Sequence, residues 1–480
     1  MQEIKKQLKT GVVFTAIGQY AGVVSNLLVS MVLSRILSPT DYGTLNIVLV
    51  FLPFFQMISE LGVGPAIIQN HDLDDLDLSS LFKMLTVVSL LIGCFFGFFG
   101  FGLSWFYGKT IYIPIAWLLS INIIFSIMSV VPVAILTKSQ QFKILNLSGL
   151  MNYIIGSVIG IISALSGLGV YALIIGSTVP AILNFFCYFR LSGLHVLSGY
   201  NRKSFLKVRH FSSNQFGFGL VNYFSRNLDN IMVGKFFGAA ALGSYGKSYQ
   251  MLTYPNSILT DVITPVIQPI LAQHQEDVEL IKNIYSKVLR LLFLVGVPLS
   301  FFLCINASPL IAFLFGGQWD SAIAPFKFLS LVVWTQIAGS TIGSIFQARN
   351  ETKYLFRTGI ISTVIIVLGI IAGIILGNIA KLAFVLSIAF LINFLFTFWM
   401  LTHFALKTNL WFVIKILIKP FLLSILPTAA SLSWIIFGKN PSSNFFQLVI
   451  NTLIFGIVFL IETWRTGDIK FVMNFIKRND

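Results

Sequence analysis

Residues 355–377 read LFRTGIISTVIIVLGIIAGIILG, and after one further residue the chain continues at 379–404 as IAKLAFVLSIAFLINFLFTFWMLTHF. A helix needs about 20 apolar residues to cross the ~30 Å hydrocarbon core of a bilayer. Such runs recur from one end of the chain to the other. They lack the segments of about ten residues, alternately apolar and polar, that form the strands of a membrane barrel. We therefore predict an all-α integral membrane protein with about fourteen transmembrane helices. The expected spans are 11–37, 44–68, 81–104, 111–136, 144–166, 168–190, 212–237, 241–270, 288–315, 322–347, 355–377, 379–404, 411–437 and 444–463.

The composition supports the same class. Of the 480 residues, 56% are hydrophobic and only 10% are charged, whereas soluble domains carry about a quarter charged residues. The formal net charge of +15 would suit a nucleic-acid-binding protein. The basic residues, however, lie in short loops between the apolar spans, where they determine orientation in the membrane. No nucleic-acid partner is expected.

The distribution of basic residues also predicts which side each loop faces. With the N-terminus in the cytoplasm, 24 of the 32 lysines and arginines fall on the cytoplasmic side of the expected spans. Because cytoplasmic loops carry an excess of lysine and arginine, both termini are predicted to be cytoplasmic. The first apolar segment is too long and too polar for the core of a cleaved signal peptide. Only five basic residues fall on the other side: Arg35, Lys109, Lys235, Lys381 and Lys439.

An internal repeat divides the chain. A shift of 200 residues superposes Arg35 on Lys235, Gly43 on Gly243 and Pro65 on Pro265, and a shift of 210 superposes Lys143 on Lys353 and Gly149 on Gly359. Six spans separate the copies, an even number, so the repeats have parallel topology. We expect two six-helix lobes around a central cavity, an N-lobe (1–195) and a C-lobe (196–405). Residues 406–480 should form two additional helices and a cytoplasmic tail.

Polar residues at helical spacing mark faces hidden from lipid. In the first span, Thr15, Gln19, Gly22 and Asn26 follow one face, and in the seventh span Gln215, Gly219, Asn222, Arg226 and Asp229 do the same. Because these are equivalent positions of the two repeats, the stripes are predicted to line a cavity from opposite sides. The alternative is ordinary helix packing through small and polar residues.

Charges inside spans are costly and normally pair or face water. Arg226 and Asp229 are the sharpest case: either they neutralise each other, or Arg226 attracts an anionic group while Asp229 binds a coupling cation. On the eighth span Lys247, Tyr254 and Asp261 recur every seven residues on one face. Lys247 and Lys327 lie close enough to a membrane interface that snorkelling is the alternative to a cavity role.

Motifs of other classes are missing from the sequence. It has no Walker-type glycine loop, no metal-binding histidine or cysteine spacing, and no Ser–His–Asp arrangement. The acidic segment 71–77, HDLDDLD, lacks the glycine and terminal glutamate of a calcium loop. It is predicted to be a solvated loop that leads into a helix N-terminus. We expect a transporter, without a cofactor or metal, and not an enzyme.

Two motifs resemble one known family. Residues 34–43 (SRILSPTDYG) and 60–69 (ELGVGPAIIQ) are similar to the first lobe of bacterial polysaccharide exporters of the O-antigen, colanic-acid and teichuronic-acid type. Residues 226–235 (RNLDNIMVGK) with 242–245 (LGSY) resemble the matching second-lobe element. The family belongs to a superfamily that also contains multidrug extruders and lipid II flippases. The resemblance covers essentially the whole chain.

The resemblance implies a flippase of the bacterial inner membrane. It would move undecaprenyl-diphosphate-linked oligosaccharide to the outer leaflet by alternating access, with Na⁺ or H⁺ as the candidate coupling ion, alongside other polysaccharide assembly proteins. Arg226, Lys247 and Lys327 would then bind the diphosphate, and Tyr249 and Tyr254 would stack on sugar. The alternatives are a cation-coupled organic-cation extruder centred on Asp229 and Asp261, a membrane-embedded polymerase or ligase, and a non-transporting scaffold.

Overall fold

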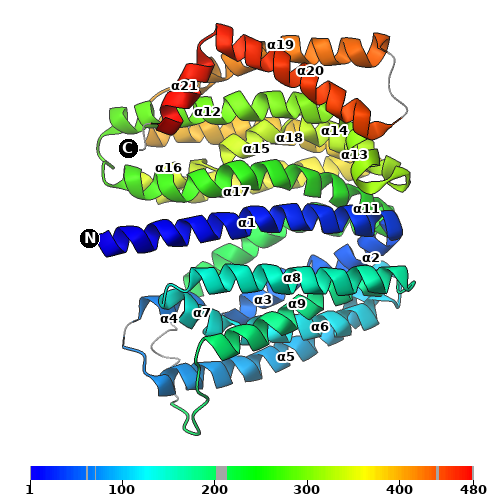
Figure 1. Ribbon diagram of the computed structural model, residues 1–480, viewed down its shortest axis with the longest axis vertical. Helices are drawn as coiled ribbons and strands as arrows, with labels where there is room; N and C mark the ends of the chain where they lie inside the picture. Colours follow the sequence, from blue (N-terminus) through cyan, green and yellow to red (C-terminus); the bar gives the residue numbers. More distant parts are fainter. Residues whose placement is uncertain (1, 61–62, 71, 202–212, 439–442, 478–480) are drawn as a thin grey trace. The chain divides into compact units, whose positions relative to one another are not determined.

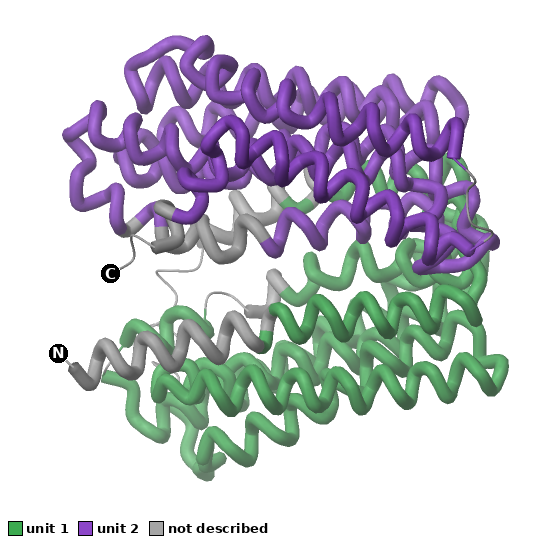
Figure 2. Tube along the Cα trace, turned by 45° about the horizontal axis from the view of Figure 1, so that its top comes forward, with its two compact units in different colours: residues 1–243 green, residues 244–480 purple. Residues whose placement is uncertain are grey.

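The computed structural model describes residues 2–60, 63–70, 72–201, 213–438 and 443–477, and within them the chain is helical with no strand (Figure 1). The chain divides into two compact units, Met1–Gly243 and Ser244–Asp480 (Figure 2). The lobe boundaries expected near residues 195 and 405 stay predictions. The all-α membrane fold is confirmed.

Unit 1 consists of helices that pack side by side along their lengths. The helix α5 lies along α6, α8 lies along α9, and α1 lies along α8. The α11 helix is broken at Gly238, whose φ of 84° is outside the helical range, and its residues fall in both units. The bounds are α1 (Gln2–Ile36), α2 (Pro39–Leu49), α3 (Leu52–Glu60), α4 (Val63–Gln69), α5 (Asp75–Tyr107), α6 (Tyr112–Met128), α7 (Val130–Lys138), α8 (Phe142–Leu165), α9 (Val170–Leu191) and α11 (Ser213–Ala272).

Unit 2 contains the remaining helices. The helix α17 lies along α18, and α12 packs against α19, which in turn packs against α20. The bounds are α12 (Val278–Ile305), α13 (Ala307–Phe315), the 3-10 helix η2 (Gly317–Ala322), α14 (Ile323–Ser330), α15 (Val333–Gly339), α16 (Ile342–Ala348), α17 (Thr352–Ile375), α18 (Ile379–Met400), the π-helical turn η3 (Leu401–Ala405), α19 (Trp411–Phe437), α20 (Asn444–Arg465) and α21 (Asp468–Lys477).

Every expected span contains helix, although not every one is a single unbroken helix in the part of the chain that the structure describes. Among the described residues, nine helices are long and apolar enough to cross a membrane, or ten if Gly317–Ser330 and Val333–Ala348, bent by 53°, form one span. The expected second span is divided into α2, α3 and α4, with Pro53 and Pro65 near the start of a helix, where proline is tolerated. The count of fourteen stays a prediction.

Helix α12 begins well before the expected start at residue 288. The side chain of Asp277 accepts a hydrogen bond from the Leu280 N–H at 2.9 Å and caps the helix at Val278. The first turns alternate apolar and charged residues, so a search for apolar runs does not include them. Their apolar face is nevertheless buried, since Tyr285 and Ile281 are inaccessible to solvent.

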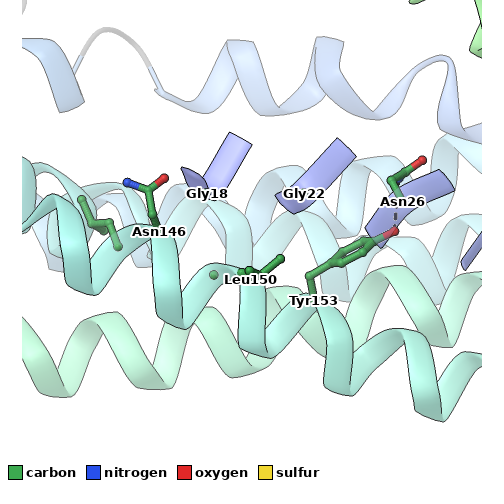
Figure 3. A pocket seen from close by; sticks show the side chains of 8 residues that line it. Gly18, Gly22, Asn26, Asn146, Leu150 and Tyr153 are labelled. Carbon is green, nitrogen blue, oxygen red and sulfur yellow. Dashed lines mark hydrogen bonds between the residues drawn. The ribbon is translucent and has the colours of Figure 1, made fainter. Parts of the chain in front are cut away.

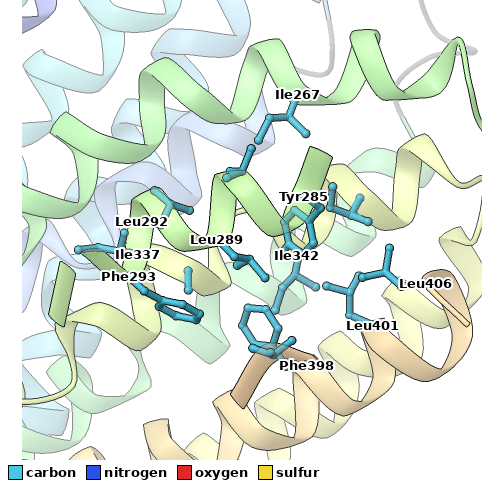
Figure 4. Close-up of a cluster of buried hydrophobic side chains, with 14 of the residues drawn as sticks. Ile267, Tyr285, Leu289, Leu292, Phe293, Ile337, Ile342, Phe398, Leu401 and Leu406 are labelled. Carbon is cyan, nitrogen blue, oxygen red and sulfur yellow. The ribbon is translucent and has the colours of Figure 1, made fainter. Parts of the chain in front are cut away.

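Tyr285 belongs to the hydrophobic core of unit 2, shown in Figure 4. Leu289, Leu292 and Phe293 of α12 pack there with side chains from α15, α16 and α18. The hydroxyl of Tyr285 is 2.9 Å from that of Thr341, so its polar end is satisfied inside the core. Farther along the unit, the Asn451 amide donates to Asn306 Oδ1 at 2.8 Å and joins α20 to the end of α12.

Gly43 and Gly243, which the 200-residue shift superposes, meet in unit 1. A Cβ atom added to Gly43 would lie 1.6 Å from the carbonyl oxygen of Ala239 and 2.9 Å from the Gly243 nitrogen. One added to Gly243 would lie 1.9 Å from the Pro39 oxygen and 3.0 Å from the Gly43 nitrogen. The backbones of α2 and α11 therefore touch, and only glycine fits at either position.

The prediction for the acidic segment 71–77 is correct in one part and wrong in another. Asp74 caps α5, since its Oδ1 accepts a hydrogen bond from the Asp77 N–H at 2.6 Å. Asp77 is not solvated: it is fully buried, and its Oδ1 accepts from the Asn201 amide at 2.9 Å. Lys83 also donates to the carbonyl oxygens of Leu197 and Gly199. The segment after α9 is thus bound to the start of α5, which the spacing of the acidic residues could not reveal.

Candidate functional site

A pocket of about 440 Å³ lies between α1 and α8 in unit 1 (Figure 3). Two members of the predicted stripe on the first span, Gly22 and Asn26, line it, whereas the side chains of Thr15 and Gln19 lie outside the described residues. The stripe therefore faces α8 over the length that the structure describes. The lining residues are Gly18, Gly22, Asn26, Leu145, Asn146, Gly149, Leu150 and Tyr153.

The pocket is open at one end and closely packed at the other. A Cβ added to Gly18 would lie 2.8 Å from the Asn146 Cβ, whereas one added to Gly22 would have no atom within 4 Å. At the open end the Asn26 amide donates to the Tyr153 hydroxyl at 3.1 Å. The two helices thus touch at Gly18 and separate at Gly22, where a polar group from each helix faces the space. Such a surface suits hydroxylated ligands.

The first half of α11 carries the second stripe. Its Asp229 is only 5% exposed, and Oδ1 accepts a hydrogen bond from the N–H of Asn230 at 2.8 Å. The side chains of Gln215, Asn222 and Arg226 lie outside the described residues. The predicted pairing of Arg226 with Asp229, and the cavity role of the stripe, stay predictions.

This half of α11 is bound to the end of α5. The Tyr107 hydroxyl donates to the Ile231 carbonyl at 3.2 Å. The Lys235 ammonium donates to the Phe106 carbonyl and lies 4.4 Å from the centre of the Phe106 ring. Tyr223, nearer the start of α11, donates to the Val50 carbonyl. Asp229 therefore sits on a segment held by hydrogen bonds on both sides of it.

Lys247 is buried in unit 2 and does not snorkel, because its side chain is only 3% exposed. Its ammonium donates to Gln250 Oε1 at 3.2 Å, and the Gln250 amide donates to the Tyr254 hydroxyl at 2.8 Å. The ammonium also lies 4.8 Å from the centre of the Phe315 ring and 5.5 Å from that of Trp319. A cation is thus held by aromatic faces and by a relay of polar groups that ends at a tyrosine.

The other predicted residues of unit 2 are Tyr249, Lys327 and Asp261. Tyr249 lines a small cavity of about 60 Å³ that also includes Asn256 and Gln336. Its ring centre lies 5.0 Å from that of Tyr245. Lys327 is exposed on α14, and the side chain of Asp261 lies outside the described residues. No group of histidines, cysteines and carboxylates that could hold a metal occurs among the described residues.

Sequence reasoning missed the partners of both sites. On α8, Asn146, Gly149 and Tyr153 follow the same spacing as the stripe on α1, so the stripe rule applied to residues 144–166 would have found them. Gln250 lies three residues after Lys247 on the same helical face. No sequence pattern identifies Phe315 and Trp319 as neighbours of Lys247, because periodicity within one helix does not show which aromatic residues of another helix approach a lysine.

Comparison with solved structures defines the fold as that of polytopic membrane transporters. The protein is similar to the lipid II flippase MurJ in an inward closed conformation, with a TM-score of 0.76 and 18% identity, covering 95% of this chain and 99% of that one. An inward-facing multidrug resistance MATE transporter has a TM-score of 0.62 at 13% identity, covering 85% of this chain and 99% of that one.

The family follows from the sequence. A model of the family described as polysaccharide biosynthesis protein matches residues 32–324, and the chain belongs to this family. The teichuronic acid biosynthesis protein TuaB of Bacillus subtilis is 23% identical, over 93% of this chain and 92% of its own length. The lipopolysaccharide biosynthesis protein WzxC of Escherichia coli is 22% identical, over 77% of this chain and 76% of its own length.

Proposed function

We propose that this protein is a flippase for undecaprenyl-diphosphate-linked oligosaccharide. It would move the sugar from the cytoplasmic to the periplasmic leaflet of a bacterial inner membrane, by ion-gradient-linked alternating access, for assembly of a surface polysaccharide. Family membership supports a role in surface-polysaccharide assembly, since TuaB and WzxC bear the names of teichuronic acid and lipopolysaccharide biosynthesis proteins. The fold shared with the lipid II flippase MurJ supports transport as the activity. The orientation with both termini in the cytoplasm is supported by the basic residues of the loops.

The observation that carries the proposal is the buried ammonium of Lys247. A charge inside a membrane-spanning unit costs several kcal/mol, and such residues usually serve a transport pathway. Here the ammonium is 3% exposed, and its neighbour Gln250 connects it to the Tyr254 hydroxyl. A phosphate could replace Gln250 as the hydrogen-bond acceptor. We therefore assign Lys247, with Arg226 and Lys327, to the diphosphate of the substrate.

The other parts of the transport cycle are assigned by chemistry. The pocket of α1 and α8 presents Asn26, Asn146 and Tyr153, whose amides and hydroxyl suit a sugar. Asp229, at 5% exposure, and Asp261 are the candidate groups for binding Na⁺ or H⁺. In this assignment binding and transport need no covalent chemistry, so the protein acts as a transporter and not as an enzyme.

The test is reconstitution in liposomes that contain a lipid-linked oligosaccharide. The rate at which the sugar becomes accessible to a lectin on the opposite face would be measured with and without an imposed Na⁺ or H⁺ gradient. We expect Lys247→Met and Arg226→Ala each to lower this rate at least tenfold, about 1.4 kcal/mol. Lys381→Met, which removes an exposed lysine at the start of α18, should keep the wild-type rate.

Two outcomes would redirect the assignment. Wild-type transport by Lys247→Met would mean that the ammonium only stabilises the packing of Phe315 and Trp319. Absence of sugar translocation, with pumping of an organic cation such as ethidium, would make the protein an extruder and place Asp229 and Asp261 at its centre.

A further inference from the structure

A second cavity, of about 540 Å³, lies in unit 2 where α12, α19 and α21 meet. Its volume is within the range of about 300–1,000 Å³ that small-molecule sites occupy. None of its residues belongs to the transport sites described above. The lining residues are Ser286, Lys287, Arg290, Leu294, Lys415, Ile416, Lys419, Pro420, Asp468 and Phe471.

The lining of this cavity is strongly basic. It carries four cationic side chains and a single carboxylate, that of Asp468. The Asp468 side chain is 1% exposed and binds the guanidinium of Arg290 at 2.5 Å and the ammonium of Lys419 at 2.6 Å. It also accepts a hydrogen bond from the Thr466 hydroxyl at 2.6 Å. Asp468 is therefore fully engaged by Arg290, Lys419 and Thr466, and the lining keeps a surplus of positive charge.

Two lysines supply that surplus. Lys287 and Lys415 are exposed, and neither has a carboxylate within 4.0 Å in the ranges that the structure describes. Lys287 comes from α12 and Lys415 from α19, so the two ammonium groups border the cavity from different helices. Two cations contributed by different helices are an arrangement that a phosphate can bridge.

Apolar side chains line the same cavity, and α19 carries exposed apolar side chains beyond it. Leu294, Ile416 and Phe471 line the cavity, and the Arg290 guanidinium lies 4.3 Å from the centre of the Phe471 ring. On α19, Ile418 is 43% exposed and Leu422 is 61% exposed. In a membrane protein such exposed apolar side chains contact acyl chains. A ligand of this cavity should therefore combine an anion with a hydrocarbon chain.

We propose that this cavity binds the head group of an anionic phospholipid such as phosphatidylglycerol. The phosphate lies between Lys287 and Lys415, and one acyl chain runs along Leu294 and Ile416 toward the exposed side chains of α19. Basic pockets between membrane helices bind acidic lipid head groups through this combination of charge and apolar surface. The proposal does not depend on which molecule the protein transports.

The test compares lipid retention by native mass spectrometry of the purified protein in a non-ionic detergent. Phosphatidylglycerol and phosphatidylethanolamine with identical acyl chains are added at equal concentrations. The double variant Lys287→Ala/Lys415→Ala is compared with Lys353→Ala/Lys470→Ala, which removes two exposed lysines from outside the cavity. Each lysine near a membrane surface strengthens attraction to anionic lipid about fivefold. We expect a roughly 25-fold loss of phosphatidylglycerol retention in the first variant and less than a twofold change in the control.

Equal retention of phosphatidylglycerol by the wild type and the cavity variant would overturn the proposal. So would equal binding of the water-soluble deacylated head group, because a free phosphate would then suffice and the apolar side chains of the lining would have no role. If the cavity variant does not fold, the proposal is tested on the wild type alone, by the effect of salt on its lipid preference. Its preference for phosphatidylglycerol over phosphatidylethanolamine must fall as salt is raised, and a preference unaffected by salt contradicts the proposal.

Discussion

The contact between Gly43 and Gly243 gives the sharpest prediction about the architecture. Substituting alanine at Gly43 would place a Cβ 1.6 Å from the Ala239 carbonyl oxygen. An added Cβ atom in ordinary van der Waals contact lies 3.4–4 Å from its neighbours, so α2 and α11 would have to separate by roughly 2 Å. The Ala239 carbonyl oxygen belongs to the backbone, so no change of side-chain rotamer can relieve the clash. The packing around both helices must therefore shift with it.

The expected cost follows from measured overpacking. Inserting a methyl group into a well-packed site costs about 1–3 kcal/mol, and occasionally more. Because a backbone must move, we expect Gly43→Ala and Gly243→Ala each to lower the free energy of unfolding by about 3 kcal/mol. The double variant should cost clearly less than the sum, since one separation of the helices relieves both clashes.

A matched control is available on α5. An alanine Cβ at Gly102 would have no atom within 4 Å, and within a helix alanine is favoured over glycine by about 0.5–1 kcal/mol. Unfolding in detergent, followed by tryptophan fluorescence during titration with dodecyl sulfate, would give the free energy of unfolding of the four variants and of the wild type. Gly43→Ala with the stability of Gly102→Ala would refute the close contact. Strictly additive effects of the two glycine substitutions would refute their sharing one contact.

Three further predictions concern unit 2 and the pocket of unit 1. Asn451→Leu leaves Asn306 Oδ1 without its donor and should lower the unfolding free energy by about 1–3 kcal/mol, measured by the same titration; unchanged stability would show that the pair contributes nothing. Burial raises the pKa of Asp468, but hydrogen bonds from Lys419, Thr466 and Arg290 outweigh it and hold the pKa below its usual value. The contribution of the Asp468 carboxylate to stability is therefore complete above the ordinary pKa of about 3.9 and is lost only as the pH falls through the lowered folded-state value. Amide exchange in α21 should rise over that pH range in the wild type, and the variant Asp468→Asn should show no such rise. Gly22→Leu fills open space, so stability should change by less than about 1 kcal/mol while sugar translocation falls severalfold; undiminished translocation would exclude this pocket from the pathway.

The sequence predicts most of the fold because membrane helices must be long and apolar. The break in α11 at Gly238 falls between the expected spans 212–237 and 241–270. Segments that mix apolar with charged residues are not found by a search for apolar runs. The early turns of α12 and the whole of α21 mix apolar with charged residues, so their burial depends on packing partners that a window of hydropathy cannot detect.

Residues that line the pocket of unit 1 were predictable where one helix carries the signal and not where two helices must meet, and the cavity expected between the two stripes stays a prediction. Gly22 and Asn26 lie on the predicted stripe and line the pocket, because helical periodicity alone fixes their common face. The partner Tyr153 and the rings around Lys247 come from other helices. Which helix faces which depends on the packing of the whole unit, so their positions required the structure.

The bond between Asp77 and Asn201 has a consequence for the order of events during synthesis. Domains usually fold as they leave the ribosome, the N-terminal part first. Asp77, however, obtains its Asn201 partner only from a residue 124 positions later in the chain. Until α9 has been inserted and residue 201 has emerged, the Asp77 carboxylate lacks this partner, although the N–H of Asp74 at the start of α5 can already donate to it. The first unit therefore reaches its final packing late, and a nascent chain that stalls before residue 201 should remain a substrate for quality-control proteases.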